Sequence, residues 1–192
     1  MKHIICVMGP TNSGKTTFIE QLIRDQKRFH GVFVGRALRA KYPPEYFEGR
    51  DSPAHTAAEA ENLLTRGCFT AWDQGKIPVL DGQPRDAGQL DYVRALGKHH
   101  AAPVIYSMLW CPREMREARA IARDADDEKA LELSASRMDR DAASLYELER
   151  LLCFRYGHNV FHISTKTPES TKAGVSSLCR QLEVPELAEG QS

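Results

Sequence analysis

The residues with the clearest chemical meaning form one short run near the start of the chain, Gly9-Pro10-Thr11-Asn12-Ser13-Gly14-Lys15-Thr16, which fits the pattern G-x-x-x-x-G-K-[ST]. Glycine allows a loop of this kind to turn so that successive backbone N–H groups point inward at phosphate oxygens. In such loops the lysine reaches the β- and γ-phosphates of a nucleoside triphosphate, and the hydroxyl of the last residue is offered to Mg²⁺. The run therefore predicts a loop that binds the phosphates of ATP, with these nucleotide-binding residues: Gly9, Asn12, Ser13, Gly14, Lys15, Thr16 and Thr17.

A second candidate is Asp81, the carboxylate that ends the apolar segment Pro78-Val79-Leu80-Asp81. Ligands of open parallel sheets bind at the carboxyl ends of the strands, so a strand here would bring Asp81 to the phosphates. A carboxylate in that position holds Mg²⁺, usually through water. We therefore expect Thr16 and Asp81 on the metal side of the site, although a strand that ends in Asp-Gly is also a common turn.

One element must precede the phosphate loop and another must follow it, and the hydrophobic pattern supplies both. The apolar run Ile4-Ile5-Cys6-Val7-Met8 predicts a strand buried on both faces of a parallel sheet, and apolar residues at helical spacing predict a helix over 15–28. The alternation of strands with helices along the chain predicts an α/β fold with a parallel sheet. Further strands are expected over 31–34, 77–80, 104–109 and 160–163, and further helices over 37–41, 54–64, 68–74, 89–99, 114–123, 128–153 and 169–182.

Composition limits the classes of function. The 192 residues include 26 basic and 26 acidic side chains, and the formal net charge of zero argues against a broad electrostatic grip on duplex DNA or an anionic membrane. The five cysteines are scattered and lack the paired spacing of a zinc site, which is typical of reduced thiols in a cytoplasmic protein. The apolar start is too short for a signal peptide or a membrane span. We expect a cytoplasmic monomer with no membrane partner.

The stretch Leu80-Asp81-Gly82-Gln83-Pro84-Arg85 resembles the adenylate kinase family of nucleoside monophosphate kinases, whose members carry Asp-Gly-Phe-Pro-Arg here. Gln89 follows at the spacing of that family's base-reading glutamine, and Gly35-Arg36-Ala37-Leu38-Arg39 resembles its Thr-Gly-Asp-x-Leu-Arg segment. Cys111-Pro112 and then Arg119 and Arg123 match a proline and two arginines that lead into a lid. Arg137-Met138 resembles the Arg-Leu that follows the lid, so the resemblance runs from Ile4 to about Ser164.

The resemblance implies the fold of a P-loop NTPase, a three-layer sandwich whose five-stranded parallel sheet carries a helical acceptor-binding insertion and a short lid. The whole chain, 1–192, would form a single P-loop kinase domain. The segment 43–75 holds helices without a strand, so it also reads independently as an insertion over the sheet edge. The expected parts are a core over 1–42, 76–123 and 137–184, the insertion over 43–75, and a lid at about 124–136 that is too short for the zinc-bearing type.

The resemblance also implies roles for the basic residues. Phosphoryl transfer needs in-line positioning and positive charge around the transferring group rather than covalent help. Arg39 and Arg85 would hold the acceptor's phosphate, Arg123 and Arg137 would close over the transferring phosphoryl, and Arg119 would stack on the donor base. Arg113 and Arg116 are expected at the surface. The implied catalytic residues are Lys15, Asp81, Arg85, Arg123 and Arg137, and the implied acceptor-binding residues are Gly35, Arg36, Arg39, Arg85 and Gln89.

Three departures from the family bear on the acceptor. Val34 replaces a base-contacting threonine, Arg36 replaces an aspartate, and Gln83 replaces the phenylalanine of the Asp-Gly-Phe-Pro-Arg motif. The expected reaction is transfer of the γ-phosphoryl group from ATP or another nucleoside triphosphate, with Mg²⁺, to a nucleoside or deoxynucleoside monophosphate.

Two alternatives stay open at this point. One is a P-loop kinase that acts on a polynucleotide, on a hydroxymethylated pyrimidine in DNA or on a small hydroxyl acceptor, where Asp81 or Asp51 would serve as the general base. Nucleic acid would be a partner only in this reading. The other is a nucleotide-binding regulatory module that binds ATP tightly without turnover.

Overall fold

The computed structural model describes residues 2–43, 54–158 and 160–182. Within them, a single parallel sheet forms the centre of the fold, and its strand order is β2-β3-β1-β4-β5, where the numbers follow the chain. The predicted α/β fold with five parallel strands is therefore confirmed. The strands are β1 (Ile4–Met8), β2 (Phe29–Val32), β3 (Ile77–Asp81), β4 (Val104–Trp110) and β5 (Val160–Ser164).

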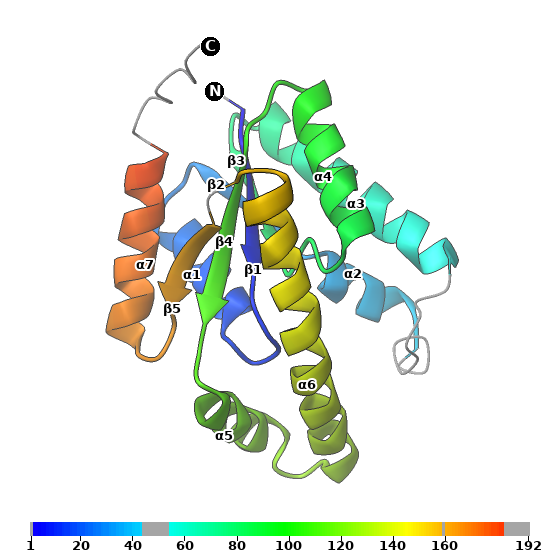
Figure 1. The fold of residues 1–192 in the computed structure, drawn as a ribbon, viewed down its shortest axis with the longest axis vertical. Helices are drawn as coiled ribbons and strands as arrows, with labels where there is room; N and C mark the ends of the chain where they lie inside the picture. The colour runs from blue at the N-terminus through cyan, green and yellow to red at the C-terminus, as the bar shows by residue number, and fades with distance from the viewer. Residues whose placement is uncertain (1, 44–53, 159, 183–192) are drawn as a thin grey trace.

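Helices cover both faces of the sheet (Figure 1). On one face lie α1 (Lys15–Asp25) and α7 (Pro168–Gln181). On the other lie α2 (Val34–Lys41), α3 (Ala54–Asp73), α4 (Ala87–His99) and the end of α6 (Glu128–Arg150), which continues into a π-helical turn, η2 (Leu151–Arg155). The remaining helix, α5 (Arg113–Asp124), lies beyond the carboxyl end of β4 and packs against α6.

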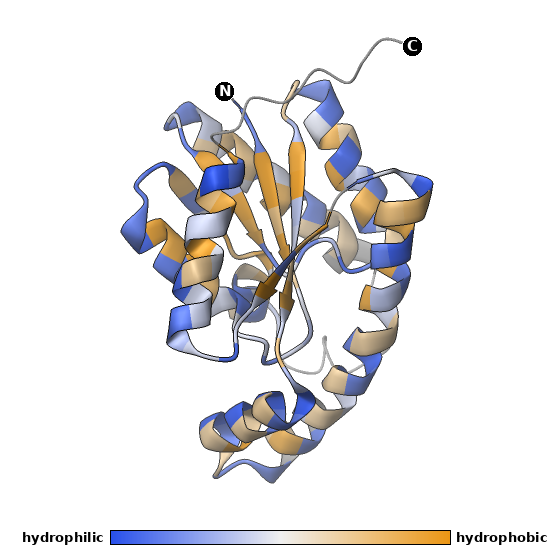
Figure 2. Cartoon of the chain, turned by 60° about the vertical axis from the view of Figure 1, so that its left-hand side comes forward, coloured by the Kyte–Doolittle hydropathy of each residue, from blue (hydrophilic) through white to orange (hydrophobic). Residues whose placement is uncertain are grey.

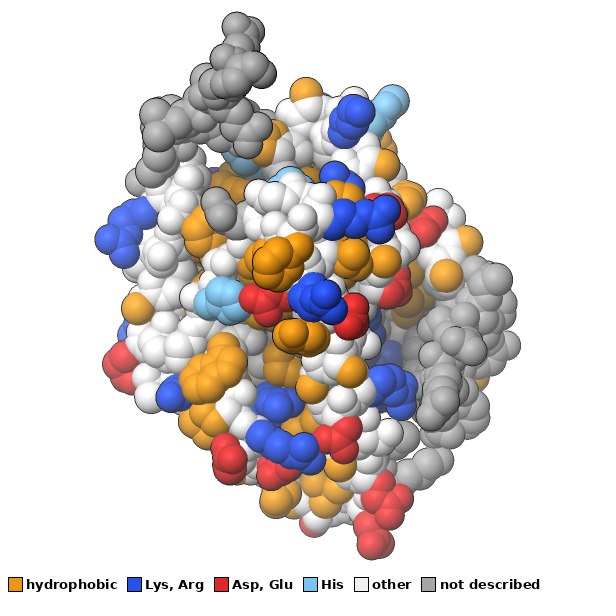
Figure 3. All heavy atoms as spheres, viewed as in Figure 1, with side chains coloured by type: hydrophobic (Ala, Val, Ile, Leu, Met, Phe, Trp, Pro, Cys, Tyr) orange, Lys and Arg blue, Asp and Glu red, His pale blue; other side chains and the backbone are white. Residues whose placement is uncertain are grey.

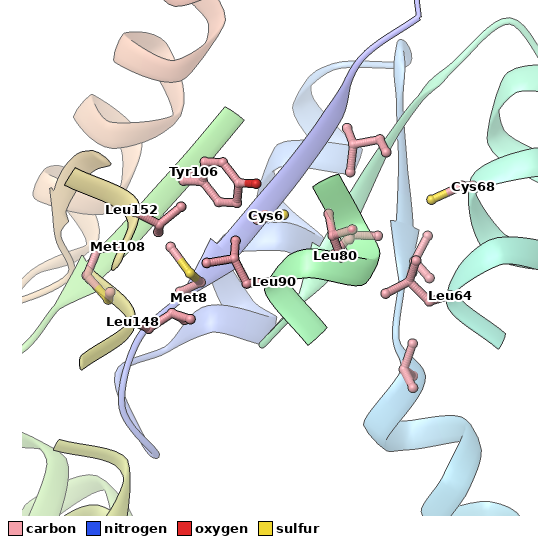
Figure 4. Close-up of a cluster of buried hydrophobic side chains, with 14 of the residues drawn as sticks. Cys6, Met8, Leu64, Cys68, Leu80, Leu90, Tyr106, Met108, Leu148 and Leu152 are labelled. Carbon is pink, nitrogen blue, oxygen red and sulfur yellow. The ribbon is translucent and has the colours of Figure 1, made fainter. Parts of the chain in front are cut away.

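The middle strand, β1, joins the two layers because all five of its residues are buried. Ile4, Cys6 and Met8 belong to the hydrophobic cluster beneath α2, α3, α4 and α6, part of which Figure 4 shows. Ile5 and Val7 belong to the opposite cluster, beneath α1 and α7. In Figure 2 the strands are correspondingly hydrophobic, whereas the helices mix hydrophobic and hydrophilic residues. Burial on both faces explains why a continuous apolar run forms this strand.

Some elements begin or end elsewhere than the hydrophobic pattern predicted. The second strand is Phe29–Val32 rather than 31–34, because Val34 already begins α2 and is buried in the core. The long helix expected over 128–153 ends at Arg150, where the backbone changes to the π-helical turn η2. Apart from α3, the other predicted elements agree with the structure to within about three residues at each end.

The two helices expected over 54–64 and 68–74 are one continuous helix, α3. Gly67 lies within it, and a Cβ atom added there would stand 2.5 Å from Cγ1 of Val32. Glycine therefore does not break this helix but allows it to pack closely against β2. Within the described part of the predicted insertion, α3 packs on β2 and β3; the rest, 44–53, lies outside the described residues.

The segment expected to form the lid, 124–136, is largely helical. The helix α5 ends at Asp124 and α6 begins at Glu128, so only 125–127 connect them. Asp127 caps α6 by accepting a hydrogen bond from the Ala130 N–H at 2.9 Å. Among the residues described here, none of the helices combines the length and the apolar character that crossing a membrane requires.

Candidate active site

The phosphate loop connects β1 to α1 at the carboxyl edge of the sheet (Figure 1). Val7, near the end of β1, is paired with Asp81 of β3 on one side and with Ser107 of β4 on the other. The Gly82 N–H donates to the Val7 carbonyl at 2.9 Å, which fixes the chain directly after Asp81. Parallel pairing thus places this carboxylate beside the start of the loop.

Two glycines of the loop are required by its backbone. Gly9 has a φ of +145°, and a Cβ atom added to it would stand 2.8 Å from the Leu109 carbonyl oxygen. Gly14 has a φ of +87° and immediately precedes α1, whose start is not capped by any side chain. The first N–H groups of a helix lack partners within the helix and attract anions. The start of α1 therefore offers amide donors and a positive helix end to a phosphate.

Lys15 folds back over the loop. Its Nζ atom donates to the carbonyl oxygens of Gly9 and Pro10, both at 2.8 Å. Burial lowers the pKa of this ammonium group to about 8; the charges of Asp81 and Asp141 oppose the shift, and Arg85 and Arg116 add to it. An anionic ligand would stabilise this partly buried cation further, because it would add negative charge to that of Asp81 and Asp141.

Thr16 and Asp81 meet beside Lys15. The Thr16 hydroxyl donates to Oδ2 of Asp81 at 2.9 Å, although the two residues are 65 positions apart. Hydroxyl and carboxylate oxygens are ligands that suit Mg²⁺, which usually completes its shell with waters and substrate phosphates. The described residues contain no group of three or more metal-ligating His, Cys, Asp or Glu side chains. This pair fits a metal ion that arrives together with phosphate.

Arg39 of α2 and Arg85 of the segment after β3 converge at Gly35. A Cβ atom added to Gly35 would lie 3.3 Å from Nη1 and 3.7 Å from Nη2 of Arg39, and 3.7 Å from Nη2 of Arg85. Burial lowers the pKa of Arg39 from its usual value, and the charges of Arg85 and Arg137 lower it further. The absence of a side chain at Gly35 thus leaves room for two guanidinium groups to lie close together despite their repulsion.

Arg39, Arg85 and Arg137 lie outside the ion pairs that the described residues form. Among the described residues, no ion pair joins Arg39, Arg85 or Arg137 to an acidic side chain. The Arg85 side chain is oriented instead by its own turn, since its Nε donates to the Gly82 carbonyl at 3.1 Å. The charge of Asp81 opposes the shift at Arg39, whose pKa is nevertheless lowered, so this group of three positive charges marks a place for an anion.

Gln89 stabilises the turn that carries Arg85. Its Oε1 accepts a hydrogen bond from the Arg85 N–H at 2.9 Å, and its own N–H donates to Asp86 at 2.8 Å, at the start of α4. The structure therefore brings Gln89 to the predicted acceptor side, where its amide oxygen is engaged by the protein backbone.

Arg119 and Arg123 attach α5 to the phosphate loop at Asn12. Arg119 donates from Nη1 to the Asn12 carbonyl at 3.3 Å and from Nη2 to the Thr165 carbonyl at 2.6 Å. Arg123 donates from Nη1 to Oδ1 of Asn12 at 2.8 Å and pairs with Asp124, whose pKa this hydrogen bond lowers. Both predicted arginines thus reach the loop, and Arg123 also has a carboxylate partner of its own.

Some predicted residues lie apart from this group. Arg36 pairs with Glu20 at 2.8 Å and lies over the Phe33 ring, with 59% of its side chain exposed. Val34 is buried in the hydrophobic core. Thr17 is exposed on α1. Asp51, the alternative candidate for a general base, lies outside the described residues.

Arg116 corrects an expectation, because it is buried rather than at the surface. It is 9% exposed, and its Nε donates to the Cys111 carbonyl at 3.2 Å, while Nη1 has no hydrogen-bond partner among the described residues. We expected α5 to be a charged helix exposed to solvent, and for Arg116 this was wrong. The residue lies one turn from Ala120, on the inward face of α5. The four-residue spacing between Arg116 and Ala120 was the feature of the sequence that could have indicated burial of Arg116.

Asp141 is a second residue that sequence reasoning missed. It lies on α6, and its Oδ2 accepts hydrogen bonds from the N–H of Thr11 at 2.7 Å and from the Thr11 hydroxyl at 2.5 Å. The two residues are 130 positions apart, so no local pattern joins them. The contact brings a carboxylate to the phosphate loop itself.

Positive charge is therefore concentrated at the site although the chain has no net charge. The face seen in Figure 3, with α6 in front, intermixes basic, acidic and hydrophobic side chains and presents no continuous basic surface. Searches against protein-family models and against curated proteins found no match.

Proposed function

We propose that this chain is a P-loop kinase that transfers the γ-phosphoryl group of ATP, or of another nucleoside triphosphate, to the phosphate of a nucleoside or deoxynucleoside monophosphate. The observation that carries the proposal is the convergence of three parts at one edge of the sheet. These are the phosphate loop with Lys15, the Thr16–Asp81 pair at 2.9 Å, and the unpaired guanidinium groups that meet at Gly35.

The residues on the donor side fit Mg²⁺ and a nucleoside triphosphate. The uncapped start of α1 and the ammonium group of Lys15 would hold phosphate oxygens, and Thr16 with Asp81 would hold the metal ion. When bound, Mg²⁺ would neutralise charge on the phosphates. Arg119 holds the loop after β5 to Asn12 through two of its hydrogen bonds, and its plane would provide a stacking surface for the donor base.

The unpaired arginines favour an anionic acceptor. Arg39 and Arg85 would each present planar N–H donors to the acceptor's phosphate, which suits bidentate binding. Arg137 contributes its charge to the same region, where it lowers the pKa of Arg39. A phosphate acceptor attacks with an oxygen that is already ionised, so no protein base is needed. A hydroxyl acceptor would need one, and Asp81 is already bonded to Thr16.

The protein would act by positioning the two substrates, without forming a covalent bond to either of them. The loop and the arginines would hold the two phosphates toward each other, which replaces a bimolecular encounter by a local one. Lys15 and Arg137 would stabilise the charge that develops on the transferring group. Exclusion of water from this basic site would limit hydrolysis of the donor.

The test is an ADP-release assay with Mg²⁺-ATP and a panel of nucleoside and deoxynucleoside monophosphates, run beside labelled transfer to an oligonucleotide with a free 5′-hydroxyl. Release of ADP that depends on a monophosphate, with the diphosphate as product, is expected. Transfer to the oligonucleotide alone would favour the hydroxyl-acceptor alternative. Tight ATP binding without turnover on any acceptor would favour a regulatory module.

A further inference from the structure

Asp141 places a negative charge where the proposed donor would place another. One of its oxygens, Oδ2, accepts from both the N–H and the hydroxyl of Thr11, at 2.7 and 2.5 Å. Thr11 belongs to the loop whose amides bind phosphate in proteins of this pattern. A single carboxylate oxygen that receives two donors of such a loop has the charge and the hydrogen-bonding pattern of a phosphate oxygen.

The position of Asp141 along the donor follows from its neighbours. Its charge is one of those that act on Lys15, the residue that reaches the β- and γ-phosphates. Thr11 precedes Lys15 in the loop, on the side away from the helix start that holds the inner phosphates. Asp141 therefore faces the outermost phosphate of a bound triphosphate rather than the inner two.

The carboxylate is attached to an element that is itself held in place. Asp139, two residues earlier on α6, forms an ion pair with Arg113 of α5 at 2.9 Å. Ser134, also on α6, accepts a hydrogen bond from Arg123 at 2.9 Å. In Figure 1 α6 runs beside the loop between β1 and α1. Moving Asp141 away from Thr11 therefore requires either a new side-chain rotamer or a displacement of α6.

We infer that Asp141 is a specificity-determining residue of the donor site, which occupies the place of a terminal-phosphate oxygen in the free protein and selectively weakens the binding of triphosphates. This inference rests on the proposed function, because it takes the loop as the donor site. A triphosphate must displace the carboxylate or accept repulsion from it, whereas a diphosphate bound at the helix start leaves the Asp141–Thr11 contact intact. Asp141 thus sets the ratio of affinities between the donor and its diphosphate product.

The experiment compares Asp141→Asn with the wild-type chain by calorimetric titration with ADP and with the β,γ-imido analogue of ATP, both with Mg²⁺. Asparagine keeps the shape and an acceptor oxygen for Thr11 but removes the charge. The Kd of the triphosphate analogue is expected to fall about tenfold, and that of ADP to change less than about twofold, because only the outer phosphate meets Asp141. Glu132→Gln is the matched control, since it removes the same charge from the same helix at an exposed carboxylate, and it is expected to change neither Kd.

The outcomes separate this inference from the function on which it rests. Absence of nucleotide binding by the wild-type chain would refute the proposed function. Binding by the wild type, with an equal gain, no gain or a loss for both nucleotides in Asp141→Asn, would overturn the inference alone. Loss of turnover at saturating nucleotide with unchanged affinities would assign Asp141 to the chemical step and would also overturn it. An unchanged melting temperature for both variants excludes unfolding as the cause.

Discussion

The donor and acceptor sides of the proposed site differ in whether their charged side chains have partners within the protein. On the proposed donor side the two polar side chains have internal partners: Lys15 is bonded to two loop carbonyls, and Thr16 to Asp81. On the acceptor side Arg39 and Arg85 lie together at Gly35 without a carboxylate in an ion pair among the described residues. The donor side is thus preorganised by the fold itself, whereas the acceptor side becomes electrostatically complete only with an anion.

This difference has an energetic consequence. A donor-side group such as Lys15 forms hydrogen bonds within the protein and would also contact the ligand. Its replacement should therefore change both ligand affinity and local order. Replacing an acceptor-side arginine relieves repulsion in the free protein, so affinity is lost without a matching loss of stability. Measuring ligand affinity and stability together therefore distinguishes the two sides.

The largest effect is expected from Lys15→Met. Loss of the ammonium group removes a charge-assisted contact to the donor's outer phosphates, and turnover should fall about a thousandfold. Steady-state kinetics with saturating acceptor measure it. Lys27→Met, a change of the same type at an exposed residue, serves as the control and should retain activity. Full nucleotide affinity and turnover in Lys15→Met would contradict the assignment of the loop.

Arg85→Ala should act on the acceptor side only. The KM for the acceptor is expected to rise about a hundredfold, while ATP affinity stays within about twofold, because the lost guanidinium contacts one substrate. The free energy of unfolding, measured with urea, should not decrease, since Arg39 loses a repulsive neighbour. Arg36→Ala is the control, because its guanidinium is paired with Glu20. A rise in KM of the same size in Arg36→Ala would restore that residue to the acceptor site.

The pH dependence of donor binding should follow Lys15. The pKa of its ammonium group is lowered to about 8 mainly by burial, so the charged, phosphate-binding form predominates below pH 8 and is lost above it. ATP affinity is therefore expected to fall as pH rises beyond 8, by at most about tenfold per pH unit. Lys15→Arg keeps its charge in that range, and its profile should be flat. An unchanged wild-type profile between pH 7 and 10 would contradict the prediction.

The smallest effect is expected from Gly35→Ala. The new Cβ would lie 3.3 Å from Nη1 of Arg39, so the guanidinium must shift by a few tenths of an ångström. Acceptor KM should rise severalfold with unchanged ATP affinity, as kinetics with each substrate varied in turn will show. Gly88→Ala, where the added atom meets only the Asp86 side chain at 3.4 Å, is the control.

The strand before the loop and the glycines within it could be predicted, because the residue types of that short segment determine both. The apolar run before the loop is buried at all five positions of β1, and the glycine pattern matches positive φ angles at Gly9 and Gly14. Asp81 could be placed because the carboxyl ends of parallel strands meet at one edge. In the first case neighbouring residues contain the physical cause, and in the second a general rule of parallel sheets supplies it.

The residues that were missed depend on packing between distant segments. Asp141 meets Thr11 across 130 positions, and only the folded course of α6 brings them together. Arg116 was assigned to the surface because a charged helix usually faces water, but α5 buries the face that it shares with Ala120. Two helices were expected over 54–64 and 68–74, but α3 is continuous, and its close packing on Val32 explains the glycine at position 67. In all three cases a contact between distant segments determines the position of the residue.

Two of the hydrogen bonds of Arg119 connect segments that lie far apart in the chain. The planar guanidinium group of Arg119 donates to the carbonyls of both Asn12 and Thr165. It therefore links the segment that follows β1 to the segment that follows β5. Under the proposed function, a base stacked on Arg119 would therefore be linked through Asn12 to the loop that holds the phosphates.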